Sequence, residues 1–178
     1  IDESQAALET INNYVLRMAK EKAEQGFLCL DRANIQTACT TVLAADTAVV
    51  FNQKILGKPK NRADAKQMLS TLSGHSHEVL TGICLAQSQR DGRLRQESLI
   101  NKTSVTFRSI TEQEIEWYWQ TGEPKDKAGG HGIQGKAAMF ISHISGSYSG
   151  VMGLPLFETS ELMTRFGFAL SGRRLNER

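Results

Sequence analysis

The spacing of apolar residues near the beginning of the chain predicts an amphipathic helix over residues 8–25. Ile11, Val15 and Met18 are separated by four and three positions, which places their side chains on one face of an α-helix. Gly26 follows this stretch, and glycine commonly occupies the position just beyond the end of a helix. The pattern therefore predicts a helix with one buried face that ends near Gly26.

A different pattern predicts strands farther along the chain. Residues 41–51 form the most apolar run and are rich in β-branched side chains, which is typical of a buried strand. Residues 77–87 and 93–108 predict two further strands that pair in antiparallel orientation. The remaining apolar segments predict three helices and a strand, at 61–73, 111–122 and 155–166 for the helices and 137–144 for the strand. Helices that alternate with strands indicate an α/β fold with a mixed sheet.

Capping residues mark the starts of the three later helices. Asn61 can cap the helix over 61–73, and Asp64 lies at its third position. Thr111 and Glu114 have the spacing of a capping box. Pro155 suits the first position of the last helix.

Composition is that of a soluble globular protein with one domain over residues 1–178. Hydrophobic residues make up 40% of the chain and charged residues 22%, and the net charge of +2 gives no electrostatic argument for binding nucleic acid or a membrane surface. No apolar stretch approaches the length of a membrane span, and the acidic residues 1–10 exclude a signal peptide at this start. Three cysteines without a CxxC pair indicate reduced thiols, so we expect a cytoplasmic protein.

Asp46 lies in the middle of the apolar run 41–51. A carboxylate is costly to bury there unless another group pairs with it. In one interpretation Asp46 ends a strand and caps a turn, as aspartate often does. In the other it binds a metal ion or accepts a proton at the floor of a pocket.

Two lysines occupy positions that suit an anion. Lys22 belongs to the apolar stripe of the first predicted helix, and Lys58 lies between Gly57 and Pro59 just before the next helix. Lys22 can simply extend its ammonium group to solvent near the end of the helix, and Lys58 can lie in an ordinary surface turn. Alternatively, these two ammonium groups and the Asp46 carboxylate suit a phosphate group and a divalent cation.

The glycine-rich loop of residues 122–135 allows the backbone to approach a ligand closely. Gly130, Gly132 and Gly135 match the letters of the dinucleotide fingerprint, but they precede a strand instead of joining a strand to a helix, which argues against it. Gln134 lies among them, and its amide can read the edge of a nucleobase. The alternative is a polar loop whose glycines serve only to make turns.

His75 and His77 would share one face of an extended strand. A zinc site needs at least three protein ligands, and the spacing reveals no third partner. We therefore interpret this pair as a solvent-exposed entry to a strand.

Short motifs, taken together and in order, resemble those of the Maf family of nucleoside triphosphate pyrophosphatases. They are ADT at 45–47, LGKP at 56–59, LSG at 72–74, TFR at 106–108, DKAG at 126–129, GIQG at 132–135, GSY at 146–148 and VMGLPL at 151–156. Residues 17–23 are similar to the lysine-bearing helix of that family, and residues 1–3 to its acidic segment. The resemblance spans nearly the whole chain, and the form GIQG resembles the dTTP/UTP subtype rather than the 7-methyl-GTP subtype.

The resemblance implies hydrolysis between the α- and β-phosphates, which produces a nucleoside monophosphate and pyrophosphate. Asp46 would be the general base or a metal ligand, and Glu3 would help to hold a divalent cation, Mg or Mn. Lys22 and Lys58 would neutralise charge on the phosphates and on the departing pyrophosphate. The implied substrate-binding residues are Thr47, Lys127, Gly132 and Gln134, of which Thr47 and Gln134 would shape base selection.

The implied fold is an α/β domain with a central mixed, strongly twisted sheet flanked by helices, and with a cleft between two lobes. The implied role is cytoplasmic house-cleaning of nucleotides. The expected ligand is a nucleoside triphosphate, neither nucleic acid nor a membrane is an expected partner, and a homodimer is allowed.

The chain departs from the family pattern in two places. The family begins with a strand, a Ser-rich loop with paired arginines that binds phosphate, and a helix, whereas this sequence starts after them. We therefore expect either part of a longer protein or a protein that lacks this element. Gly130 and His131 stand where the subtype commonly has Ala-Tyr, which bears on base or ribose contacts. Two other functions stay open, a catalytically weak nucleotide-binding module that acts in septum formation and a plain interaction domain.

Overall fold

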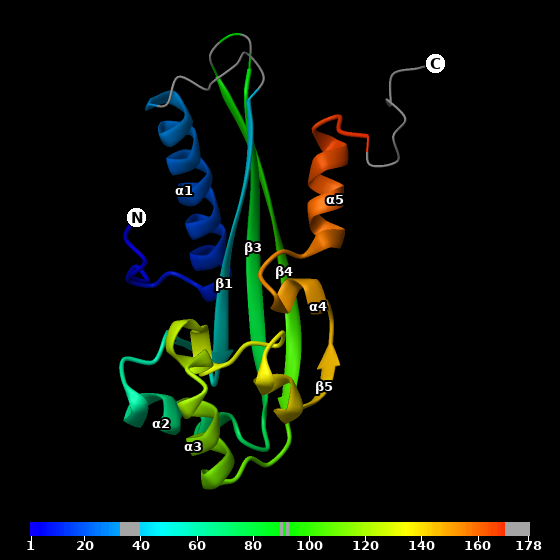
Figure 1. Cartoon of the computed structure of the whole chain (residues 1–178). Coiled ribbons are helices and arrows are strands. Elements are labelled where there is room, and N and C mark those ends of the chain that lie inside the picture. The colour runs from blue at the N-terminus through cyan, green and yellow to red at the C-terminus, as the bar shows by residue number, and fades with distance from the viewer. Residues whose placement is uncertain (33–39, 90, 92, 170–178) are drawn as a thin grey trace. The chain divides into compact units, whose positions relative to one another are not determined.

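The computed structural model describes residues 1–32, 40–89, 91 and 93–169 (Figure 1). The chain divides into two compact units. Unit 1 comprises residues 1–46, 81–101 and 154–178, and unit 2 comprises residues 47–80 and 102–153.

Helices separate pairs of consecutive strands along the described residues. The α-helices are α1 (Ile11–Arg32), α2 (Arg62–Leu72), α3 (Glu112–Gln120), α4 (Tyr148–Val151) and α5 (Leu156–Arg165). Short 3₁₀ helices follow α3, namely η1 (Glu123–Asp126), η2 (Ala128–Gly130) and η3 (Lys136–Phe140). The strands are β1 (Thr41–Phe51), β2 (Lys54–Leu56), β3 (Ser76–Ser88), β4 (Leu94–Phe107) and β5 (Ile141–Ser145). Within the described residues they form one sheet in the order β2-β1-β3-β4-β5.

The prediction of an α/β fold with a central sheet flanked by helices is confirmed, but the sheet is antiparallel rather than mixed. β1 pairs antiparallel with β2 and β4 with β5. At the end of β3, Ser88 donates its backbone N–H to the carbonyl of Thr40, just before β1, so these two strands also run in opposite directions. Asn52 and Gln53 turn β1 directly into β2, with φ of 48° and 61°, as expected for a tight hairpin. Neighbouring strands of the sheet therefore run in opposite directions. α3 lies in the chain between the antiparallel neighbours β4 and β5, whereas α2 lies between β2 and β3, which both flank β1 and do not pair with each other.

In unit 1 two helices cover opposite faces of the sheet. Side chains alternate between the two faces of a strand. Cys84 and Ala86 of β3 pack in one apolar cluster with α1, whereas Ile83 and Leu85 pack in another with Leu162 and Phe166, at α5. Burial on both faces explains why this part of β3 is a continuous apolar run. Figure 1 shows α1 running alongside the strands of this unit.

α1 continues past the residue where the sequence predicts its end. Gly26 lies inside the helix, which reaches Arg32. A Cβ atom at Gly26 would lie 2.8 Å from Val42 Cγ1, so the glycine allows α1 to approach β1 closely. The prediction that α1 ends near Gly26 is therefore wrong, because this glycine serves a close helix–strand contact and not a helix end.

Unit 2 has its own apolar core, to which α2 and α3 contribute Leu69, Leu72, Ile115 and Tyr118. The predicted caps are confirmed, since the Asn61 side chain accepts from the N–H of Asp64, and Thr111 forms the full capping box.

Two boundaries near the end of the chain differ from prediction. The strand predicted over 137–144 is instead η3 followed by β5, and Pro155 is the residue before α5 and not its first. None of the helices in the described part of the chain is both long enough and apolar enough to cross a membrane.

Candidate active site

Asp46 faces α1 because of its position in the alternation of β1. Val42 and Ala44 pack in the apolar cluster of α1, so Asp46, two residues farther along, is directed to the same face. There Lys22 of α1 donates from Nζ to Asp46 Oδ1 over 2.5 Å. Asp46 therefore lies in the middle of a strand, and the interpretation that it caps a turn is wrong.

Glu3 completes a three-residue charge cluster in unit 1. Its Oε1 lies 3.5 Å from Lys22 Nζ, so one ammonium group serves two carboxylates. The Asp46 side chain is only 11% exposed, whereas that of Glu3 is 64% exposed. Burial alone would lower the pKa of Lys22, but the hydrogen bond and the charge of Asp46 outweigh burial, and the pKa is raised. Lys22 is therefore fully charged at neutral pH.

Tyr14 borders the same cluster. Its hydroxyl donates to the backbone carbonyl of Glu3 over 3.0 Å. Burial raises the pKa of Tyr14, and the negative charges of Asp46 and Glu3 raise it further. The phenol therefore stays protonated and keeps its donor.

The donor set of Asp46 and Glu3 fits a hard divalent cation. Carboxylate oxygens are the ligands that Mg²⁺ prefers, and Mg²⁺ is usually held by one or two carboxylates together with water and substrate phosphates. In the described residues no group of three or more histidine, cysteine, aspartate or glutamate side chains converges as a metal site. Two carboxylates match the number that Mg²⁺ usually takes from a protein.

Unit 2 brings the Lys58 turn and the glycine-rich loop together. Gly129 donates its backbone N–H to the carbonyl of Gly57 over 2.9 Å, immediately before Lys58. Gly129 has φ of 64°, and a Cβ atom there would lie 2.9 Å from Val49 Cγ1, so both its conformation and its surroundings require glycine. Lys58 itself is exposed and forms no ion pair with any residue that the structure describes.

The other predicted substrate-binding residues also lie in unit 2. Gln134 is exposed in the loop between η2 and η3. The stem of Lys127 lies against Gly132, since a Cβ atom there would be 3.5 Å from Lys127 Cε, and its ammonium group lies 3.3 Å from Asp126. Thr47 follows Asp46 in β1, and its Oγ1 lies 3.4 Å from the position that a Cβ atom would take at Gly153.

Comparison with known proteins identifies the family. The model of the family described as Maf-like protein matches residues 1–166. The chain belongs to the Maf family. The resemblance inferred from the short motifs is therefore confirmed.

Relatives of this Maf protein carry a common name. A protein of Pseudoalteromonas atlantica named dTTP/UTP pyrophosphatase is 45% identical over 170 residues, which cover 95% of this chain and 84% of the relative. Proteins of the same name from Alkalilimnicola ehrlichii and Bordetella avium are 46% and 47% identical. These matches cover 93% and 95% of this chain and 79% and 81% of the relatives.

The interpretation of His77 as a solvent-exposed residue is wrong, because it packs against a second buried histidine, His131. His75 is exposed as predicted, but His77 is only 2% exposed, and its ring centroid lies 4.8 Å from that of His131. Both rings also contact Phe107 edge-on, and no ring nitrogen of either histidine has a hydrogen-bond partner in the described part of the chain. His77 is buried because the glycine-rich loop folds over it, a contact between residues distant in the sequence.

Sequence reasoning also missed Arg17 and Glu9, which lie next to the charge cluster of unit 1. The Arg17 guanidinium binds the Glu9 carboxylate and lowers the pKa of Glu9 to about 2. The available signal was an arginine one turn before Glu21 on the first predicted helix, together with an acidic segment just upstream.

Proposed function

We propose that this Maf protein hydrolyses dTTP and UTP to the nucleoside monophosphate and pyrophosphate. The relatives named dTTP/UTP pyrophosphatase support this reaction and this substrate class. The single observation that carries the assignment of roles is the Asp46–Lys22–Glu3 cluster, in which a largely buried carboxylate is held by an ammonium group.

Asp46 acts as the general base in this proposal. Lys22 engages Oδ1, whereas Oδ2 accepts no hydrogen bond from any described residue and can receive a proton from water. The water oxygen forms a bond to the α-phosphorus, the bond from this phosphorus to the bridging oxygen breaks, and pyrophosphate departs. The water proton passes to Asp46.

Lys22 and Lys58 supply positive charge for the phosphates. Ammonium groups stabilise the negative charge that develops on the departing pyrophosphate more strongly than they stabilise the bound substrate. Lys58 is suited to this role because no described residue neutralises it. Lys127, in the glycine-rich loop of residues 122–135, supplies a third positive charge for the substrate.

Asp46 and Glu3 would hold a divalent cation, Mg or Mn. Such a cation neutralises phosphate oxygens and lowers the pKa of bound water. In the glycine-rich loop, Gln134 offers an amide that matches the N3–H and carbonyl groups of thymine and uracil, and Gly132 allows close backbone approach. Thr47 of β1 contributes to base selection. The free thiols Cys29 and Cys84 support a cytoplasmic location.

The reaction is tested by hydrolysis of dTTP in H₂¹⁸O with product analysis by mass spectrometry. We expect dTMP and pyrophosphate in equal amounts, with the ¹⁸O atom in dTMP. Label in pyrophosphate, or release of dTDP and phosphate, would contradict attack at the α-phosphorus. Nucleotide binding without turnover would favour the alternative of a nucleotide-binding module.

A further inference from the structure

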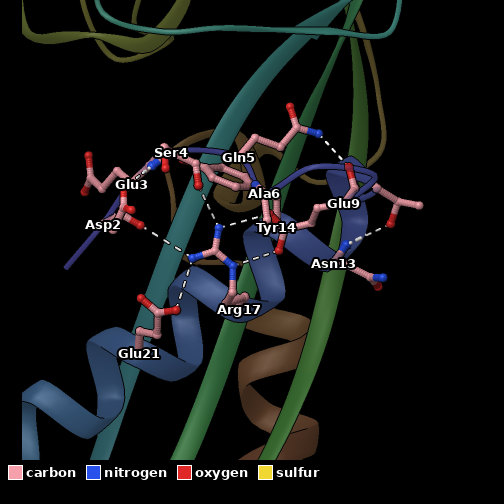
Figure 2. Close-up of polar contacts among 11 residues, drawn as sticks. Asp2, Glu3, Ser4, Gln5, Ala6, Glu9, Asn13, Tyr14, Arg17 and Glu21 are labelled. Carbon is pink, nitrogen blue, oxygen red and sulfur yellow. Dashed lines mark hydrogen bonds and ion pairs between the residues drawn. The ribbon is translucent and has the colours of Figure 1, made fainter.

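Residues 2–9 fold back along the first turns of α1 and carry Glu3 to the charge cluster (Figure 2). We call these residues the strap. Glu3 is exposed and has no secondary structure to fix its backbone. Its approach to Lys22 therefore depends on whatever holds the strap against the helix.

Arg17 is the residue on which the strap converges. Its guanidinium makes two hydrogen bonds to the Glu9 carboxylate, of 2.7 and 2.9 Å, and a third of 3.1 Å to Glu21. It also donates to the backbone carbonyls of Asp2, over 3.4 Å, and Ser4, over 2.9 Å. These two carbonyls flank Glu3, and Figure 2 shows the guanidinium enclosed by the strap and α1.

Further contacts fix the turn that closes the strap. Glu9 accepts from the N–H of Ala6 over 3.0 Å, and the Gln5 side chain donates to the Glu9 carbonyl over 2.7 Å. Leu8 has φ of 65°, a conformation that a leucine adopts only when its surroundings impose it. Glu9 is thus held by Arg17 on one side and by the strap backbone on the other.

We propose that Arg17 is a positioning residue that acts through Glu3. By binding Glu9 and the carbonyls on both sides of Glu3, it fixes the backbone from which the Glu3 carboxylate reaches Lys22. This inference rests on the proposed function, in which Glu3 helps to hold the divalent cation. The groups that orient a metal ligand commonly matter almost as much as the ligand itself.

An ordinary surface ion pair is the competing explanation, and this chain provides a matched control. Arg62 contacts Glu116 over 2.6 Å, and in that pair too an arginine on one helix binds a glutamate of another segment. Arg62 and Glu116 both belong to unit 2, whereas the strap and the charge cluster belong to unit 1. Exposed pairs of this kind usually contribute little.

The first test compares Arg17→Met and Arg62→Met by hydrogen–deuterium exchange. Methionine keeps the apolar stem and removes the guanidinium. We expect the amides of residues 2–9 to lose protection in Arg17→Met and to keep it in Arg62→Met, with α1 itself protected in both. Unchanged protection of residues 2–9 in Arg17→Met would overturn the proposal.

The second test measures Mn²⁺ binding by electron paramagnetic resonance in the presence of a non-hydrolysable α,β-imido analogue of dUTP. We expect Arg17→Met to weaken Mn²⁺ binding about tenfold, and Arg62→Met to leave it unchanged. In a protein that already carries Glu3→Gln, Arg17→Met should cause almost no further loss of Mn²⁺ affinity, because Arg17 acts through Glu3. Additive losses, or an Arg17→Met protein that binds Mn²⁺ like the parent, would overturn the proposal.

The two tests separate this inference from the proposed function. If the parent protein releases no pyrophosphate from dTTP, the proposed function fails, and the exchange and Mn²⁺ measurements still decide the role of Arg17. If the parent is active and Arg17→Met matches Arg62→Met in both measurements, only the inference fails.

Discussion

At the scale of single residues, Lys22 makes the buried Asp46 carboxylate tolerable. Removing one partner of a largely buried ion pair leaves an uncompensated charge, which is far more costly than losing an exposed pair. Lys22 is itself about one third exposed, so its ammonium group can turn from the carboxylates toward a ligand. The same side chain thus stabilises the resting site and, in the proposed function, supplies charge for phosphate.

A substitution of Lys22 can distinguish a role of its apolar stem in packing from a role of its charge in catalysis. Lys22→Met keeps the apolar stem, and we expect pyrophosphate release to slow by about 10², the effect typical of losing one positioned charge. Lys20→Met, an exposed position on the same helix, should leave turnover unchanged. Full activity in Lys22→Met would show that Lys22 only packs.

The two buried histidines predict a specific pH dependence of stability. Burial lowers the pKa of His77 to about 4 and that of His131 to about 3. In the unfolded chain both histidines have the ordinary pKa of 6.5. Between these values the unfolded state binds more protons, so the free energy of unfolding falls as the pH drops from 6.5 toward 4. The loss should be on the order of 3 kcal/mol for His77.

Urea unfolding at several pH values measures this effect. His131→Phe should flatten the decrease between pH 6.5 and 4, whereas His143→Gln, at an exposed histidine, should not. An unchanged pH profile in His131→Phe would show that this histidine is not held neutral in the folded protein.

At the scale of elements, the site depends on how closely α1 approaches the sheet. Lys22 reaches Asp46 only because α1 and β1 lie close together, and glycines at two contacts allow this. Gly26 faces a side chain, Val42, which can yield. Gly82 of β3 faces backbone instead, since a Cβ atom there would lie 2.5 Å from the Val15 carbonyl oxygen.

A methyl group at Gly82 should therefore displace α1. We expect Gly82→Ala to lower the free energy of unfolding by about 1–3 kcal/mol through overpacking. Gly57→Ala is the control. Apart from its neighbours in the sequence, no residue has an atom within 4 Å of the added methyl group, so stability should change by less than about 1 kcal/mol. Thermal unfolding of both variants makes the comparison, and equal stability would refute the close-contact argument.

Local signals account for the parts of the fold that could be predicted from the sequence. The apolar run gave the bounds of β1, and side-chain chemistry located the starts of α2 and α3. Predictions were wrong where the same sequence pattern is compatible with two different structures. Gly26 looks like a helix-ending glycine but serves a close contact, and the apolar residues after Gly135 fit a strand as well as η3.

Contacts between distant residues limited prediction of the site. The sequence alone marks Asp46, a carboxylate within an apolar run, and Lys22, a lysine on the apolar face of a helix, as candidate site residues. In the structure the two side chains form a hydrogen bond. The contact of His77 with His131 and the contact of Arg17 with the strap require the chain to fold back, and no periodic pattern encodes that. Glu9 lies ahead of the helix, so helix spacing does not link it to Arg17.

At the scale of the whole molecule, the proposal predicts selectivity for thymine and uracil nucleotides. Thymine and uracil present an N3–H donor between two carbonyl acceptors, whereas cytosine reverses the pattern at positions 3 and 4. Each unmatched buried polar group costs about 1–3 kcal/mol, so dTTP and UTP should be hydrolysed faster than dCTP and purine triphosphates. A panel of common and 7-methylated triphosphates at one Mg²⁺ concentration measures this. Rates for dTTP and UTP equal to those for dCTP and the purine triphosphates would contradict the selectivity but not the reaction.

The most direct measurement of the central claim is pyrophosphate release from dTTP by the parent protein and by Asp46→Asn. The asparagine side chain has nearly the same shape, and circular dichroism with thermal unfolding verifies that the fold is kept. If Asp46 is the general base, turnover should fall by about 10²–10⁴. A folded Asp46→Asn protein that releases pyrophosphate at nearly the parent rate would contradict the mechanism.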